Sequence, residues 1–184
     1  MPAFSVTELE ALFWQRLGRY WHTRLAGGAE EPLYLPAEGE QPALIRYAHD
    51  YFRSALHEIA HWCIAGPQRR LQQDYGYWYA PDGRNAEQQA LFLQVEEKPQ
   101  ALELLFCAAC GHEFCVSLDK LDGGEEVNAA DFEARVRGRA RSWLEQGGMP
   151  ERGRQWMEIL AEHYGVPPGP DAAGLNHVFR PLPR

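Results

Sequence analysis

A histidine pair with helical spacing lies inside a strongly apolar segment of the chain. Residues 55–63 read Ala-Leu-His-Glu-Ile-Ala-His-Trp-Cys, so His57 and His61 are four residues apart, with Glu58 between them. On an α-helix this spacing places both imidazole rings on one face, one turn apart, where they can bind one metal ion. The apolar neighbours predict that the helix is buried. Buried imidazoles need partners, so we expect a metal site, with two core histidines bonded to carbonyl groups as the alternative.

The composition is that of an ordinary globular protein. The 184 residues are 45% hydrophobic and 24% charged, which suits a single domain over residues 1–184. A net charge of −8 argues against nucleic acid as the main partner, because nucleic acid would favour a basic patch. We see no signal peptide, no apolar run long enough to span a membrane, and no disulfide framework among the four cysteines. We therefore expect a cytoplasmic protein.

A helical pattern of apolar residues dominates the sequence. The predicted helices are residues 5–25, 50–65, 85–109, 129–146 and 150–164, and the predicted strands are residues 33–35, 43–47 and 114–118. These elements predict an α+β fold, predominantly helical, with a buried histidine helix, a second ligand-bearing helix and a small sheet. Proline and glycine residues predict a loosely structured tail over residues 167–184.

The best third metal ligand lies in the second long helical segment, residues 85–109. The phase of this helix places Glu96 at the border of its buried face, whereas Glu97 points away from that face and should stay in solvent. Pro99 cannot donate a hydrogen bond to the Val95 carbonyl, so we expect the helix to kink or restart near residues 96–98. If this helix packs against the histidine helix, Glu96 completes a set of two histidines and one carboxylate.

This set of ligands allows two chemistries. In a zinc peptidase, Glu58 would be the general base that acts on a metal-bound water. The same three ligands with open positions also match the two-histidine, one-carboxylate site of non-haem Fe(II) oxygenases. The H-E-x-x-H spacing alone favours zinc hydrolysis. In a third interpretation, the metal only links two helices of a binding protein.

Two further segments have chemical interest. Residues 75–79 hold four aromatic side chains, and a proline–aspartate–glycine turn signal follows at residues 81–83. They form either a strand packed on the core or a pocket wall beside the metal, with Asp82 and Arg84 supplying charge. Three cysteines and a histidine also lie close together in sequence: Cys107, Cys110, His112 and Cys115. Structural zinc sites usually have two cysteine pairs, so we favour free thiols over a second metal site.

Several strings of residues resemble the bacterial elongation factor P hydroxylase family. These strings are residues 55–66, 74–79, 81–84, 95–96 and 98–101, in that order. The resemblance implies a hydroxylase of elongation factor P that acts on the lysine already carrying a β-lysyl group. It further implies an iron centre and a fold unlike the usual 2-oxoglutarate oxygenase barrel. Carried over by position, the metal ligands are His57, His61 and Glu96, and the role of Glu58 as base or additional ligand stays open.

The resemblance also gives the aromatic segment a role. A cationic lysyl arm would pass the faces of Tyr77, Trp78 and Tyr79, which can hold an ammonium group by cation–π attraction. Asp82 or Glu58 would add charge pairing. Fe(II) is the expected metal and molecular oxygen the expected co-substrate. A zinc-dependent hydrolase built on the same ligands is the alternative.

Overall fold

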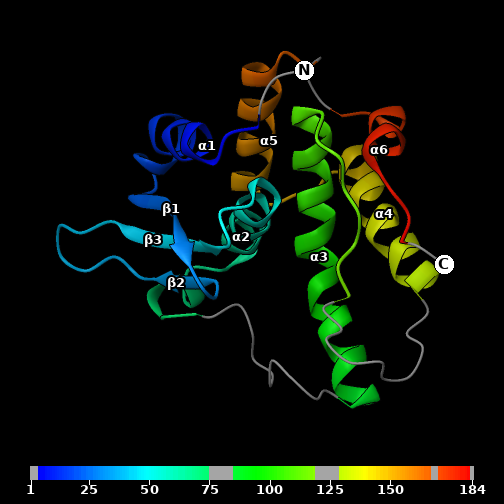
Figure 1. Ribbon diagram of the computed structural model, residues 1–184, viewed down its shortest axis with the longest axis horizontal. Helices are drawn as coiled ribbons and strands as arrows, with labels where there is room; N and C mark the ends of the chain where they lie inside the picture. The colour runs from blue at the N-terminus through cyan, green and yellow to red at the C-terminus, as the bar shows by residue number, and fades with distance from the viewer. Residues whose placement is uncertain (1–3, 75–84, 119–128, 167–169, 183–184) are drawn as a thin grey trace.

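The computed structural model describes residues 4–74, 85–118, 129–166 and 170–182. Within these ranges the chain forms six α-helices and one three-stranded sheet (Figure 1). This confirms the predicted α+β, predominantly helical fold. None of the described helices combines the length and the apolar character needed to cross a membrane.

Helix α3 (Ala86–Cys110) is the centre of the core. Every residue from 99 to 110 is buried, and such an all-round buried segment needs helices on several sides. Four helices contact α3 (Figure 1), namely α2 (Phe52–Ile64), α4 (Ala129–Gln146), α5 (Glu151–Tyr164) and α6 (Ala172–Val178). The metal-binding helix predicted from the sequence is α2, which therefore lies directly against α3.

Helix α3 runs without interruption through Pro99, although the sequence predicted a kink or restart there. Its first turn is fixed by a capping box in which Asn85 and Gln88 exchange side-chain-to-backbone hydrogen bonds. The helix ends at Gly111, whose φ of 76° suits glycine. Tight packing on all sides of the second half explains why the helix continues past the proline. Its unbroken phase also brings Glu96 to the buried side.

The sheet lies on the side of α2 away from α3 (Figure 1). Its strands are β1 (Thr23–Ala29), β2 (Leu33–Leu35) and β3 (Ala43–Ala48), in the order β1-β3-β2. β3 is parallel to β1 and antiparallel to β2, and it leads almost directly into α2. The sheet therefore fixes where the histidine helix begins.

The N-terminal helix is shorter than the sequence predicted. Helix α1 (Val6–Phe13) continues as a π-helical turn only to Gly18, and residues 23–29 form strand β1 instead of a helix end. Gly18 packs so closely against the Thr23 carbonyl that a Cβ atom would collide with it. The apolar pattern of residues 17–25 fits a helix, but pairing with β3 buries Leu25 in a strand. Tertiary pairing thus overrides the local helical period.

Residues 170–182, within the segment predicted to be a loose tail, include helix α6 and several buried side chains. Leu175, Val178 and Phe179 are buried, and α6 packs against α3. The Phe114 amide donates to the Val178 carbonyl at 2.9 Å. Residues 114–118 form no strand, in contrast to the sequence prediction, and Phe114 makes a single β-bridge with Phe179. The end of the chain thereby closes one side of the core.

Candidate metal centre

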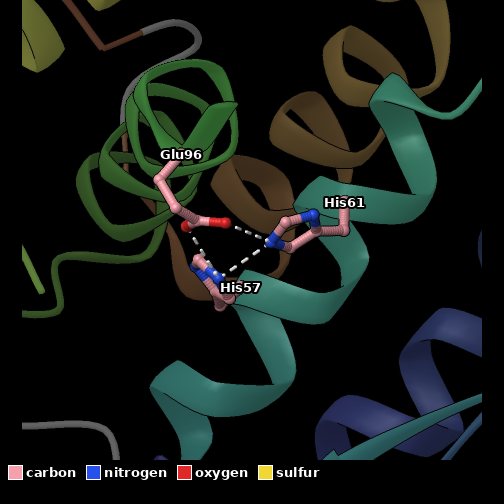
Figure 2. A group of neighbouring side chains, drawn as sticks. All are labelled: His57, His61 and Glu96. Atoms are coloured by element: carbon pink, nitrogen blue, oxygen red, sulfur yellow. Dashed lines mark hydrogen bonds and ion pairs between the residues drawn. The ribbon is translucent and has the colours of Figure 1, made fainter. Parts of the chain in front are cut away.

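Helices α2 and α3 bring the three predicted ligands together at their interface (Figure 2). His57 and His61 project from successive turns of α2, and Glu96 reaches them from α3. The two Nε2 atoms are 3.0 Å apart. The Glu96 carboxylate lies 3.2 Å from Nε2 of His61 through Oε1 and 3.4 Å from Nε2 of His57 through Oε2. The two Nε2 atoms and the Glu96 carboxylate, which turns one oxygen toward each imidazole, thus form a triangle of three side chains.

The size of this triangle fits the first coordination sphere of one metal ion. With metal–ligand bonds of about 2.1 Å, neighbouring donors lie about 3.0 Å apart at right angles and about 3.4 Å apart in a tetrahedron. The three observed separations fall between 3.0 and 3.4 Å. Within the described part of the chain, the ring nitrogens that converge on Glu96 bond to no backbone carbonyl, whereas the alternative of two core histidines would require such bonds. The donor set is able to hold an ion with nitrogen, nitrogen and oxygen ligands.

Glu103, which was not among the residues predicted from the sequence, orients His57. Its Oε2 lies 2.9 Å from Nδ1 of His57, and its Oε1 accepts two hydrogen bonds from Arg53, at 2.9 and 2.7 Å. An ionised carboxylate can only accept, so Nδ1 carries a proton and Nε2 is the ring atom left to bind a metal ion beside His61 and Glu96. Metal-binding histidines commonly have such a carboxylate partner. The sequence did contain a sign of this role, because Glu103 is a charged residue within an apolar run seven positions after Glu96.

Gln100 holds Glu96 from the next turn of α3. Its amide nitrogen lies 3.4 Å from Oε2 of Glu96 and donates to the Ser117 carbonyl at 2.8 Å. The Ser117 backbone amide donates a hydrogen bond of 2.9 Å to the side-chain oxygen Oε1 of Gln100, which fixes the orientation of the Gln100 side-chain amide. Glu96 is buried, as the helical phase predicted. Its orientation is therefore set before any ion binds.

Glu97 points away from the site but does not stay in solvent, in contrast to the prediction. Its side chain is 16% exposed and pairs with Arg139 of α4 at 2.9 Å. Arg135 lies 4.0 Å away on the same helix. Two arginines of α4 thus hold Glu97 on the outer side of α3. The two adjacent glutamates therefore contact different neighbouring helices, Glu96 the histidines of α2 and Glu97 the arginines of α4.

The charges around the triangle shift the pKa values of its members in opposite directions. Burial lowers the pKa of His57, but the hydrogen bond with Glu103 and the negative charges of Glu96 and Glu103 outweigh it and raise this pKa well above its usual value. Burial raises the pKa of Glu96, yet the nearby imidazoles reverse the effect and lower it. The centre therefore has a strong affinity for positive charge, which a proton or a metal ion can supply.

Glu58 lies where the centre meets open space. A cleft of about 700 Å³ is lined by His57, Glu58 and Glu96, and its other lining residues include Glu30, His49 and Tyr51. Glu58 also lines a smaller pocket of about 30 Å³ that reaches His61. Burial raises the pKa of Glu58, and its side chain makes no hydrogen bond to another described residue. This carboxyl group is thus placed to exchange protons beside the candidate ligands.

Arg152 of α5 fixes the other end of the histidine helix. Its Nη2 donates to the carbonyls of Trp62, Cys63 and Ala65 at 2.7, 3.0 and 2.7 Å. These are orphan acceptors at the C-terminus of α2, where a cation is also favourable for the helix dipole. The guanidinium stacks 4.5 Å from the ring centroid of Trp62 and 5.1 Å from that of Trp21. Burial and the charge of Arg70 lower the pKa of Arg152 to about 10, so it stays charged at neutral pH.

The remaining predicted site residues divide into two groups. Tyr77, Trp78, Tyr79, Asp82 and Arg84 lie outside the described residues. Cys107 and Cys110 are buried free thiols, and Cys115 accepts a hydrogen bond from Arg53. Among the described residues, no cysteine belongs to a group that could hold a metal, whereas His57, His61 and Glu96 do form one.

The fold and the site define a helical protein with two histidines and one carboxylate grouped as a candidate metal centre. The chain belongs to the elongation factor P hydroxylase family, whose sequence model matches residues 12–173. It is 40% identical over 163 residues to the elongation factor P lysine hydroxylase of Haemophilus influenzae. That match covers 88% of this chain and 90% of the relative. The family expected from the sequence strings is thereby confirmed.

Proposed function

We propose that this protein hydroxylates a lysine of elongation factor P with Fe(II) held by His57, His61 and Glu96 and with molecular oxygen as co-substrate. The observation that carries the proposal is the donor triangle of 3.0–3.4 Å beside an open cleft. Membership of the elongation factor P hydroxylase family supports oxygenase chemistry at this group of donors. Two histidines and one carboxylate are the ligand set that non-haem Fe(II) oxygenases use.

The proposed reaction replaces one C–H bond of the lysine side chain with C–OH. One oxygen atom of dioxygen enters the product, and the other leaves as water with two protons and two electrons from an external reductant. When bound, iron supplies the oxygen and one-electron chemistry that amino-acid side chains lack.

The protein's own residues prepare the site for this reaction. Glu103 keeps the proton of His57 on Nδ1, and Gln100 holds the Glu96 carboxylate in place. All three ligands come from one side, the facing surfaces of α2 and α3, so the other side is free to meet the substrate. The Glu58 carboxyl, with its raised pKa, can hold a proton at the edge of the cleft and release it to a neighbouring group. Glu58 is accordingly our candidate acid–base residue.

The proposed substrate is defined more narrowly than the family name defines it. We assign the target as the elongation factor P lysine that already carries a β-lysyl group. We assign Tyr77, Trp78 and Tyr79, with Asp82 and Arg84, to substrate binding, because aromatic faces attract an ammonium group. An enzyme of this substrate would work where translation takes place, in the cytoplasm. The proposal involves neither nucleic acid nor a membrane as a partner.

The reaction is tested by incubating elongation factor P, with and without its modification, with the anaerobically iron-loaded protein, a reductant and air. We expect the modified lysine to gain the mass of one oxygen atom by mass spectrometry. Glu96→Gln should give no gain. Metal analysis of protein purified under anaerobic conditions tests the zinc alternative in parallel. Stoichiometric zinc together with peptide hydrolysis, and no oxygen gain with iron, would replace our proposal with a zinc hydrolase.

A Glu103→Gln substitution should weaken Fe(II) binding about 10- to 100-fold, the usual cost of removing the partner of a metal-binding histidine. The neutral amide no longer stabilises the Nδ1–H of His57 by charge, and it leaves Arg53 without its carboxylate. Anaerobic titration with Fe(II) against a chelator measures the change. Glu87→Gln, at an exposed position in the first turn of the same helix, is the matched control. Equal affinity in both variants would show that Glu103 does not support the ligand.

A further inference from the structure

The turn between β3 and α2 has an unusual backbone. His49 and Asp50 are consecutive non-glycine residues with φ values of 60° and 52°. Such left-handed conformations are uncommon outside glycine, and they concentrate at ligand-binding and active sites. Tyr51 follows directly as the N-cap of α2, six positions before His57. The strained turn is therefore part of the same chain segment as the candidate metal ligands.

Contacts with the sheet hold this turn in place. The Asp50 carboxylate accepts a hydrogen bond of 2.7 Å from the Gly28 amide. A Cβ atom at Gly27 would collide with that carboxylate and with Tyr47. The Gly27 amide and the Tyr47 hydroxyl both donate to Oε1 of Glu10 at 2.8 Å. The β1–β3 pairing is interrupted at these two glycines. Their amides are therefore free to bind Glu10 of α1 and Asp50 of the turn, and these hydrogen bonds hold the turn against α1 and β1.

The result is an aromatic side chain presented at the wall of the cleft. Tyr51 is 68% exposed and lines the cleft that also contains His57, Glu58 and Glu96. The His49 ring lies 6.1 Å from the Tyr51 ring and lines the same cleft. The Tyr51 hydroxyl makes no hydrogen bond to another described residue. Neither core packing nor a structural hydrogen bond accounts for the position of this ring.

Carboxylates line the cleft. The described lining includes Glu30, Glu58, Glu96 and Glu103, of which Glu96 faces the imidazoles of His57 and His61 and Glu103 pairs with His57 and Arg53. Arg53, the single described arginine of the lining, is paired with Glu103. Glu30 is exposed and directly follows Ala29, whose carbonyl accepts a hydrogen bond from the His49 amide. It has no ion pair with a described residue. An ammonium group entering the cleft would meet the aromatic face of Tyr51 and the exposed carboxylate of Glu30.

We infer that Tyr51 is a specificity-determining residue that receives the ammonium-bearing arm of the substrate, with His49 beside it and Glu30 as a charge partner. The inference rests on the proposed function, because that function supplies a cationic side chain as substrate. An aromatic face and nearby carboxylates are together the chemistry that recognises an alkylammonium ion. The strained turn keeps the ring at the cleft in the absence of ligand, so that little order has to be created on binding.

The test measures binding and turnover of elongation factor P carrying the modified lysine with wild type, Tyr51→Ala and Tyr51→Phe. Tyr51→Ala should weaken binding and lower kcat/KM by about 2- to 30-fold, the range of a cation–π contact, with unchanged Fe(II) content. Tyr51→Phe, which keeps the aromatic face, should restore most of the loss. Glu30→Gln alone should weaken binding of the modified factor, and the loss should be larger at low salt than at high salt because salt screens the charge of Glu30. Tyr20→Ala is the control, because Tyr20 is 82% exposed and lies outside the described lining of the cleft.

The two readouts separate the two proposals. If wild type binds the modified factor without oxidising it and Tyr51→Ala weakens that binding, the hydroxylase proposal fails and the assignment of Tyr51 stands. If wild type hydroxylates the lysine and Tyr51→Ala binds and reacts like Tyr20→Ala, the assignment of Tyr51 is overturned while the function stands. Absence of any binding to wild type would contradict both.

Discussion

Replacing Glu96 with glutamine should lower the affinity for Fe(II) by about 100-fold or more and abolish hydroxylation. Loss of a residue that merely orients a ligand costs about 10- to 100-fold, and Glu96 is proposed as a ligand itself. The substitution removes a negative charge that lies 3.2 and 3.4 Å from the two imidazole nitrogens. Anaerobic equilibrium dialysis or chelator competition measures the affinity, and mass spectrometry of elongation factor P measures the reaction.

The neighbouring glutamate provides a matched control. Glu97→Gln makes the same chemical change one residue further along α3, on the side that faces Arg139. We expect its Fe(II) affinity to equal that of wild type. Similar losses in both variants would mean that the effect comes from general damage to α3. No loss in either variant would remove Glu96 from the ligand set.

The second large effect is expected at Arg152. Arg152→Met should lower the free energy of unfolding by about 2–4 kcal/mol, because carbonyls at the end of α2 lose charge-assisted hydrogen bonds. Methionine keeps much of the apolar volume between Trp21 and Trp62 but offers no donor. Urea denaturation of the metal-free protein measures the change.

Arg154→Met is the control for this substitution. Arg154 lies on the same helix and pairs in solvent with Glu151 and Glu158, so its removal should leave stability almost unchanged. We also expect Arg152→Met to weaken Fe(II) binding, since His61 directly precedes Trp62 and lies one turn before Ala65, whose carbonyls Arg152 binds. Equal unfolding midpoints for the two variants would show that the Arg152 contacts do not stabilise α2.

The histidine helix and the burial of Glu96 could be predicted because both depend on local sequence. The apolar pattern predicted α2 to within two residues of its observed bounds, Phe52–Ile64. The helical phase separated Glu96 from Glu97 correctly because α3 keeps a continuous phase through Pro99. The local helical pattern of apolar residues was therefore enough to predict most of the candidate ligand set.

The supporting residues could not be predicted because they act across long sequence separations. Glu103 orients His57 from 46 positions away, and Arg152 reaches the Trp62 carbonyl across 90 positions. Strand β1 was missed for the same reason, since its apolar residues satisfy a helical period until β3 is available for pairing. Such contacts depend on how α2, α3, α5 and the sheet pack together.

The most direct test of the account is a crystal structure of the protein grown with Fe(II) under anaerobic conditions, with anomalous data collected on both sides of the iron absorption edge. We predict one iron peak at about 2.0–2.2 Å from Nε2 of His57, Nε2 of His61 and a carboxylate oxygen of Glu96, with its open side facing the cleft. Iron located elsewhere, or an empty position between these donors in protein that retains iron, would contradict the central claim.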